Sequence, residues 1–300
     1  MLTHYQRKMI LSVCPKGSKI KTAEYFQQKY LPCPMRITIR LPDATEHGLV
    51  LRRSRHSDGC IIKEAKVFSA LTNLGLPVPE VLAGPELDPE TPDKHLVAVY
   101  SLLSGINLQE MSMLSTQECD KAGQLLLEAT TQLAQLTPQI RAVLDPHLLV
   151  EKTLAWQLDR IIEKSGNWIE TDEFNHAIIK LNPILKTNSD PLIFTNGDYQ
   201  PANFLSNGSE ITGYLDFEHA CYQDFLFGFV KYPIYDLHPL NKAGFIDHLL
   251  TQKRISVSAF AIRLALGCLW TLGREIPVEG GDKNYRQHVL ALLSQSLELI

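Results

Sequence analysis

The 300-residue sequence has no long hydrophobic run and no large excess of charge of one sign. Its most apolar stretch, Ile255 to Trp270, is shorter than the roughly 20 residues that span a bilayer, and it contains Arg263. The apolar residues that follow Arg7 and Lys8 end by Pro15, so we expect no secretory signal peptide. These absences favour a soluble, cytoplasmic protein without a membrane partner.

The sequence also has no Cys-x-x-Cys pair, and its cysteines are separated by long, irregular gaps. A chain of this length, with 45 % hydrophobic residues, builds a core without disulfides. We therefore interpret the cysteines as free thiols in a reducing compartment. They are Cys14, Cys33, Cys60, Cys119, Cys221 and Cys268.

The net charge of −4 excludes binding to nucleic acid by overall charge. The charge is unevenly distributed, at +8 in residues 1–66 and −12 in the remainder, which indicates that the N-terminal part binds an anion. The basic cluster from Arg52 to His56 is consistent with a local nucleic-acid-binding patch. We favour two strand arginines followed by a solvated loop, and we predict no nucleic-acid partner.

Ser101 to Gly105 is a natural linker, and the pattern of elements changes there, so the chain divides near residue 103. Before it, short strands surround one helix; beyond it, long helices predominate, including a helical face from Cys119 to Leu136. The sequence therefore predicts an α+β fold with a small antiparallel-sheet lobe with one helix (residues 1–102) and a larger, mainly helical lobe (103–300). Expected strands are 35–41, 48–53, 81–83 and 95–100; expected helices are 61–74, 151–164, 171–181, 242–252, 255–271 and 284–299.

The most informative segment runs from Leu192 to Glu218. An apolar strand ends just before Asp198, Asn203 follows five positions later, and a hairpin with an Asn-Gly turn signal leads to Asp216. A hairpin places the start of its first strand beside the end of its second. We therefore expect Asn203 and Asp216 to meet.

Two carboxylates and an amide oxygen suit a hard divalent cation and a hydroxyl nucleophile. Mg²⁺ prefers oxygen ligands and commonly binds through one or two carboxylates together with substrate phosphates. The remaining carboxylate can orient a hydroxyl and accept its proton. Phosphoryl transfer needs little more than such positioning and charge neutralisation.

A second signal lies on the helix that begins near Ile61. Glu64, Phe68 and Leu71 share one face of this helix. A carboxylate on an apolar face is costly unless it is paired. Arg52 or Arg53, on the preceding strand, is the expected partner.

These features together resemble the aminoglycoside phosphotransferase family of protein-kinase-like enzymes. NGDYQPANFL is similar to that family's HGDxxxxN catalytic loop, and LDFE resembles its metal-binding segment. The segments GLVLRRS, KEAKVFSAL, LPVPEVLAG and AVYSLLSGINL follow the family's order, so the resemblance covers roughly residues 45–230. It implies a bilobal protein-kinase-like fold.

The resemblance also implies a role for each residue of the catalytic segment. Asp198 would be the catalytic aspartate that faces the hydroxyl of a small-molecule acceptor. Asn203 and Asp216 would hold Mg²⁺ against the nucleotide phosphates. The implied reaction is transfer of the γ-phosphoryl group of ATP.

In the N-terminal lobe the resemblance implies a nucleotide site. Arg52 would contact the phosphates, and Glu64 would be its ion-pair partner. The linker from Tyr100 to Leu103 would be the hinge against which adenine stacks.

Three departures from the family pattern leave alternatives open. Asn196 replaces the histidine before Gly-Asp, Ser101 replaces a glutamate at the hinge, and Gly228 replaces a second aspartate. One alternative is a catalytically weak nucleotide-binding pseudokinase or scaffold. A separate alternative, which does not depend on these departures, is a metal-dependent hydrolase that uses Asp198, Asp216 and Glu218.

The acceptor is not specified by the sequence. Residues 219–300 contain 8 basic and 7 acidic residues, whereas a pocket for a polycationic aminoglycoside is expected to be acidic. We therefore expect a metabolite or sugar-like compound. The choice between ATP and GTP and the oligomeric state stay open.

Overall fold

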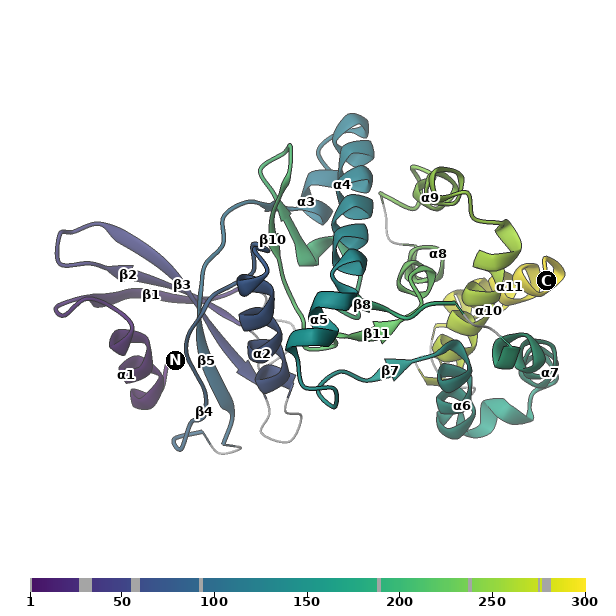
Figure 1. Cartoon of the computed structure of the whole chain (residues 1–300), viewed down its shortest axis with the longest axis horizontal. Helices are drawn as coiled ribbons and strands as arrows, with labels where there is room; N and C mark the ends of the chain where they lie inside the picture. Colours follow the sequence, from purple (N-terminus) through teal and green to yellow (C-terminus); the bar gives the residue numbers. More distant parts are fainter. Residues whose placement is uncertain are drawn as a thin grey trace. The chain divides into compact units, whose positions relative to one another are not determined.

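The computed structural model describes residues 2–26, 34–54, 60–91, 94–187, 190–236, 239–274, 276 and 282–300. The chain divides into two compact units (Figure 1). The first comprises Met1–Asn107, Pro138–Leu148 and Ala202–Ala220, and the second comprises Leu108–Thr137, Leu149–Pro201 and Cys221–Ile300. Residues 138–148 and 202–220 thus belong with the N-terminal part. The division into a nucleotide-binding lobe up to residue 102 and a catalytic lobe from residue 103 stays a prediction.

The first unit contains a five-stranded antiparallel sheet in the order β1-β2-β3-β5-β4. The side chains of β2 alternate: Met35, Ile37 and Ile39 are buried, whereas Arg36 and Arg40 are exposed. This period of two is typical of a strand with one face against a core. The strands are β1 Lys19–Tyr25, β2 Met35–Arg40, β3 Glu46–Ser54, β4 Val81–Leu87 and β5 Leu96–Ser101.

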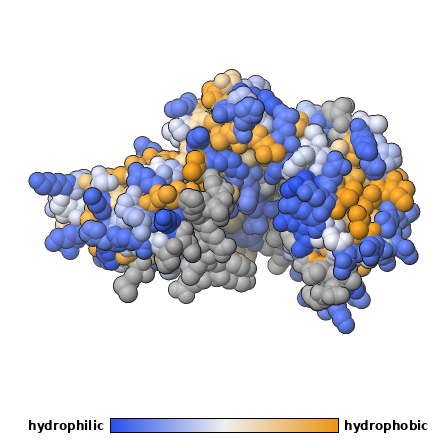
Figure 2. All heavy atoms as spheres, turned by 90° about the horizontal axis from the view of Figure 1, so that it is seen from below, coloured by the Kyte–Doolittle hydropathy of each residue, from blue (hydrophilic) through white to orange (hydrophobic). Residues whose placement is uncertain are grey.

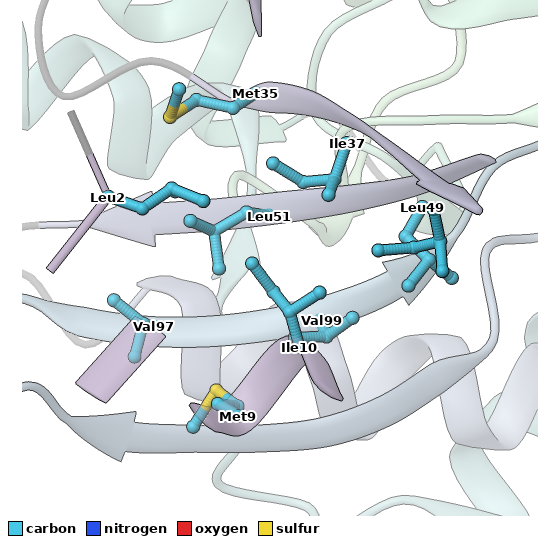
Figure 3. Close-up of a cluster of buried hydrophobic side chains, with 10 residues drawn as sticks. Leu2, Met9, Ile10, Met35, Ile37, Leu49, Leu51, Val97 and Val99 are labelled. Atoms are coloured by element: carbon cyan, nitrogen blue, oxygen red, sulfur yellow. The ribbon is translucent and has the colours of Figure 1, made fainter. Parts of the chain in front are cut away.

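A helix covers each face of this sheet. Helix α1 (His4–Ser12) contributes Met9 and Ile10 to a buried cluster with alternate residues of the strands (Figure 3). Helix α2 (Cys60–Asn73) places Phe68 against the Tyr100 ring of β5 on the other side. Because both faces are covered, β5 is buried from Leu96 to Tyr100 and reads as a continuous apolar run.

The predicted fold class is confirmed. Helix α1 and strand β1, which precede residue 34, were not predicted. The helix begins with a capping box, in which Thr3 and Gln6 each bind the backbone N–H of the other. The fully buried Asp88 accepts hydrogen bonds from the Thr3 hydroxyl at 2.9 Å and the Gln6 amide at 2.7 Å. The helix is only nine residues long, so its apolar period is too short to be evident in the sequence.

The predicted hairpin is present in the first unit. Strand β9 (Phe204–Ser206) pairs antiparallel with β10 (Ile211–Tyr214), and β6 (Ile106–Asn107) pairs with the other edge of β9. Gly208 in the turn has a φ of +93°, which the Asn-Gly sequence accommodates without strain. The backbone N–H of Tyr214 donates to the carbonyl of Pro77, which joins the hairpin to the chain segment after α2.

The second unit is mainly helical, as predicted. One predicted helix begins later than expected: Glu151–Lys152 form β7, which pairs with β11, and Thr153 caps the helix that starts at Leu154. The helices are α3 Leu108–Ser112, α4 Thr116–Gln135, α6 Leu154–Lys164, α7 Asp172–Thr187, α8 Lys231–Tyr235, α9 Phe245–Lys253, α10 Val257–Arg274 and α11 Lys283–Glu298. The small sheet is β7-β11-β8, with β8 Ile193–Thr195 and β11 Cys221–Gln223; α5, Thr137–Val143, lies almost wholly in the first unit.

Helix α10 is long and apolar enough to cross a membrane by length and composition alone. However, 56 % of this stretch is buried inside the structure, as expected for the core helix of a folded domain. On the face shown in Figure 2, hydrophobic side chains reach the surface in groups between hydrophilic ones. The cytoplasmic location stays a prediction.

We predict that Asp88→Ala destabilises the first unit by about 2–3 kcal/mol, because it leaves the buried amide of Gln6 and the half-buried hydroxyl of Thr3 without their acceptor. Urea unfolding measures the loss, and hydrogen exchange should show α1 losing protection first. The exposed Glu80→Ala in the same unit is the control, expected within about 0.5 kcal/mol of the parent protein. Equal stability of both variants would contradict the anchoring role of Asp88.

Candidate active site

Arg52 on β3 and Glu64 on α2 form an ion pair in the first unit. The Nε of Arg52 lies 3.3 Å from Oε2 of Glu64, whose side chain is only 2 % exposed. Glu64 also accepts hydrogen bonds from the Phe217 backbone N–H at 3.1 Å and from the Tyr100 hydroxyl at 3.4 Å. The predicted pairing of Glu64 with an arginine of the preceding strand is confirmed, with Arg52 as the partner.

The neighbouring arginine points away from this pair. The Cζ of Arg53 lies 5.1 Å from the centre of the Tyr25 ring, on the face of the sheet opposite to Glu64. The two strand arginines thus face opposite sides of the sheet, as alternate residues of a strand do. Arg55 and His56, the other members of the basic cluster, lie outside the described residues.

The guanidinium of Arg52 also contacts two carboxylates beyond the hairpin. Its Nη2 lies 3.4 Å from Oδ1 of Asp216 and 2.6 Å from Oε2 of Glu218. The backbone N–H of Leu215 donates to the carbonyl of Asn203 at 2.8 Å. The hairpin therefore brings Asn203 and Asp216 to one end, as predicted, and Glu218 joins them.

The backbone at Asp216 is itself unusual. Its φ is +57°, in the left-handed region that non-glycine residues seldom adopt. Aspartate tolerates this region better than most residues, and such conformations are found where surrounding contacts hold them. The contact of its carboxylate with Arg52 at 3.4 Å is one such restraint.

Charge in this cluster is unbalanced, because three carboxylates surround one guanidinium. Burial raises the pKa of Glu64 to about 7, although Arg52 opposes the shift; Asp216 and Glu218 add to it. Burial disfavours the charged form of Arg52, but the carboxylates of Glu64, Asp216 and Glu218 outweigh it and raise its pKa. The site as built has an excess of acidic groups.

This excess of acidic groups suits a divalent cation. Asp216 and Glu218 are 35 % and 30 % exposed, so their oxygens are accessible. No three His, Cys, Asp or Glu side chains among the described residues are placed to hold a metal ion by themselves. Mg²⁺ commonly completes its shell with phosphate oxygens, so one or two protein carboxylates and an amide fit it.

Tyr100 and Leu103 differ in their availability for a nucleotide. Tyr100 is buried, with its ring against Phe68 and its hydroxyl on Glu64, so its side chain supports the ion pair and is not exposed for stacking on adenine. Leu103 is partly exposed, and its side chain lies against Gly213 of the hairpin. Of the two predicted hinge residues, only Leu103 presents accessible side-chain surface.

In the second unit, Asp198 lies in a loop that follows β8. The side chain of Asn196 accepts a hydrogen bond from the backbone N–H of Asp198 at 3.1 Å. The buried hydroxyl of Tyr232 donates to the carbonyl of Tyr199 at 2.7 Å. Asn196, which departs from the family's histidine, therefore supports the loop through its own side chain.

Gly228 has a packing explanation in the same unit. A Cβ at this position would lie 2.2 Å from Cδ2 of Tyr199, so the ring of Tyr199 occupies the space that any larger residue would need. Tyr199 is buried, and its ring packs on Phe229 at a centroid distance of 4.9 Å. Glycine therefore stands where the family pattern has a second aspartate because the ring of Tyr199, the residue after Asp198, fills the space of a side chain.

Asp224, which follows β11, has a structural role. Its carboxylate accepts hydrogen bonds from Nε and Nη2 of the buried Arg263 at 3.2 and 2.8 Å. Arg263 also pairs with Asp190. This ion-pair network joins α10 to the segment after β11.

One residue at Asp198 was missed by the sequence analysis. The Nζ of Lys231 lies 2.7 Å from Oδ1 of Asp198. Nothing in its spacing indicates this contact, because 33 residues separate the two and no motif includes Lys231. The only available signal is that Lys231 is the first lysine or arginine after Asp216.

The antiparallel sheet with its Arg–Glu pair and the mainly helical second unit define an α+β, kinase-like phosphotransferase fold. The structure is similar to that of a thermostable mutant of aminoglycoside phosphotransferase APH(4)-Ia, in a ternary complex with AMP-PNP and hygromycin B. That similarity has a TM-score of 0.68 at 14 % identity and covers 99 % of both chains. It is also similar to APH(2″)-IIIa with GDP and kanamycin, at a TM-score of 0.62, 14 % identity and 98 % coverage of both chains.

The sequence model of the phosphotransferase enzyme family, APH, matches residues 39–237. The chain belongs to this family and is a phosphotransferase. No curated protein sequence matches it.

We predict that Glu64→Ala destabilises the protein by about 3–5 kcal/mol, because it removes one partner of a buried ion pair and the acceptor of the Phe217 N–H. Glu64→Gln, which keeps an acceptor of the same shape, should lose less. Urea unfolding of the two variants measures the difference. Parent-like stability of Glu64→Ala would show that the pair is dispensable for the fold.

Proposed function

We propose that the chain is an ATP-dependent kinase that transfers the γ-phosphoryl group to a hydroxyl of a small molecule. The observation that carries this proposal is the cluster in which Arg52 contacts Glu64, Asp216 and Glu218. Such a cluster offers both a cation for phosphate and oxygen ligands for Mg²⁺. Membership of the phosphotransferase family supports the same reaction class.

Each residue has a distinct proposed role. Bound Mg²⁺ would neutralise charge on the nucleotide phosphates, and Asn203 and Asp216 would be its protein ligands. Arg52, held by Glu64, binds phosphate oxygens. Asp198 orients the acceptor hydroxyl and takes its proton while the new O–P bond forms.

The acceptor proposed is a metabolite or sugar-like compound with a free hydroxyl. Hygromycin B and kanamycin are bound in similar structures, and they are ligands of those proteins. In this chain Lys231 lies beside Asp198, and the last 82 residues are nearly neutral, which disfavours a polycationic acceptor.

The departures that raised the alternative of an inactive pseudokinase have local explanations. Asn196 binds the Asp198 backbone, and Gly228 accommodates Tyr199. The Ser101 hydroxyl accepts a hydrogen bond from the Glu80 backbone N–H at 2.9 Å, so it has a structural place at the end of β5. These contacts favour an active enzyme.

We predict that Asp198→Asn lowers the rate of phosphoryl transfer from Mg·ATP about 10²–10⁴-fold, because it removes the general base. Transfer of radiolabelled γ-phosphate to a panel of polyols, sugars and hydroxy acids measures the rate. Nucleotide binding, followed by thermal shift, should stay within about twofold of the parent protein.

The matched control is Asp159→Asn, an exposed aspartate on α6 of the same unit, which should leave transfer unchanged. Full activity of Asp198→Asn would refute its role as base. Phosphate release that requires no ATP would support the hydrolase alternative instead.

A further inference from the structure

The ammonium group of Lys231 is fixed next to the proposed catalytic base. Its Nζ lies 2.7 Å from Oδ1 of Asp198, and the two side chains are 34 % and 16 % exposed. Both residues belong to the second unit, so the contact is internal to one compact body. The cation is therefore held at the carboxylate and still accessible to a ligand.

The backbone that carries Lys231 is firmly anchored on either side. Tyr232 is fully buried and its hydroxyl binds the loop of Asp198 through the Tyr199 carbonyl. Val230 packs so closely on α10 that a Cβ at Gly267 would lie 2.7 Å from its Cγ2. The same contacts that position the Asp198 loop thus position Lys231. An ordinary surface ion pair joins two flexible side chains and has no such buried support.

Electrostatics at the moment of transfer give this cation a function. The acceptor oxygen must lie about 2.6–3.2 Å from the Asp198 carboxylate for proton transfer, and the phosphorus atom bonds to that same oxygen. The anionic carboxylate and the anionic phosphoryl group therefore approach each other closely. A cation between them lowers their repulsion, and such stabilisation is commonly the largest contribution to catalysis.

We propose that Lys231 is a catalytic residue that contacts the transferred phosphoryl group, an inference that rests on the proposed kinase function. The acceptor oxygen forms its bond to the γ-phosphorus, and the bond from phosphorus to the β,γ-bridging oxygen breaks with its electron pair leaving on ADP. The acceptor proton goes to Asp198 and then to solvent. As Asp198 becomes neutral, the Lys231 ammonium passes from the carboxylate to the phosphoryl oxygens.

A probe that needs no acceptor tests this role. Tetrafluoroaluminate bound with Mg·ADP mimics the phosphoryl group during transfer. The quantity measured is the ratio of the Mg·ADP affinity with tetrafluoroaluminate to the affinity without it. Lys231→Met keeps the length of the side chain and removes its charge. We expect unchanged Mg·ADP affinity, a loss of about 10²–10³-fold in the tightening by tetrafluoroaluminate, and most of it restored in Lys231→Arg.

Two controls separate this role from a structural one. Lys242→Met removes an exposed lysine of the same unit and should behave as the parent protein. In an Asp198→Asn background, Lys231→Met should still reduce the effect of tetrafluoroaluminate, because the contact proposed is with the phosphoryl group as well as with Asp198.

The outcomes distinguish the two proposals. If the parent protein shows no Mg·ADP binding, the kinase function itself is overturned, and the role of Lys231 with it. If the parent protein binds Mg·ADP and responds to tetrafluoroaluminate, a parent-like response of Lys231→Met refutes the role of Lys231 alone. Reduced stability of that variant with an unchanged response would likewise leave Lys231 a structural residue and refute the proposal.

Discussion

The burial of the Glu64 carboxylate is the constraint on which the first unit depends. A carboxylate that is 2 % exposed is tolerated only with partners, and its partners come from three separate parts of the chain. Arg52 lies on β3, Tyr100 on β5, and the Phe217 N–H follows the hairpin. One buried charge thus joins the sheet, helix α2 and the hairpin, and it sets where Arg52 points.

The position of Arg52 in turn links fold to function. Its guanidinium is shared by Glu64, Asp216 and Glu218, which leaves an acidic surplus at the end of the hairpin. A nucleotide with its metal would supply the missing positive charge together with phosphates for Arg52. In the second unit, the buried Tyr232 hydroxyl and the Asn196 side chain hold the loop of Asp198, and Lys231 places a cation at the Asp198 carboxylate.

Much of this could be predicted from the sequence, because the signals were local. The period of two in β2, the apolar face of α2 and the Asn-Gly turn each determined an element, and the spacing of Asn203 and Asp216 followed from the hairpin. Helix α1 is held by Asp88, which is 85 residues from Thr3, and Lys231 is 33 residues from Asp198. Contacts between residues so far apart in the chain leave no periodic pattern in the sequence. Tyr100 shows the same limit, since its strand was predicted but not the direction of its side chain.

The proposed function requires that the carboxylates beside Arg52 and Asp198 of the second unit serve one phosphoryl transfer. A crystal structure of the protein with AMP-PNP and Mg²⁺ tests it most directly. The account predicts a metal ion ligated by Asn203 and Asp216 and by phosphate oxygens, Arg52 on a phosphate, and the γ-phosphate facing Asp198. A nucleotide bound elsewhere, or bound with its γ-phosphate away from Asp198, would contradict it.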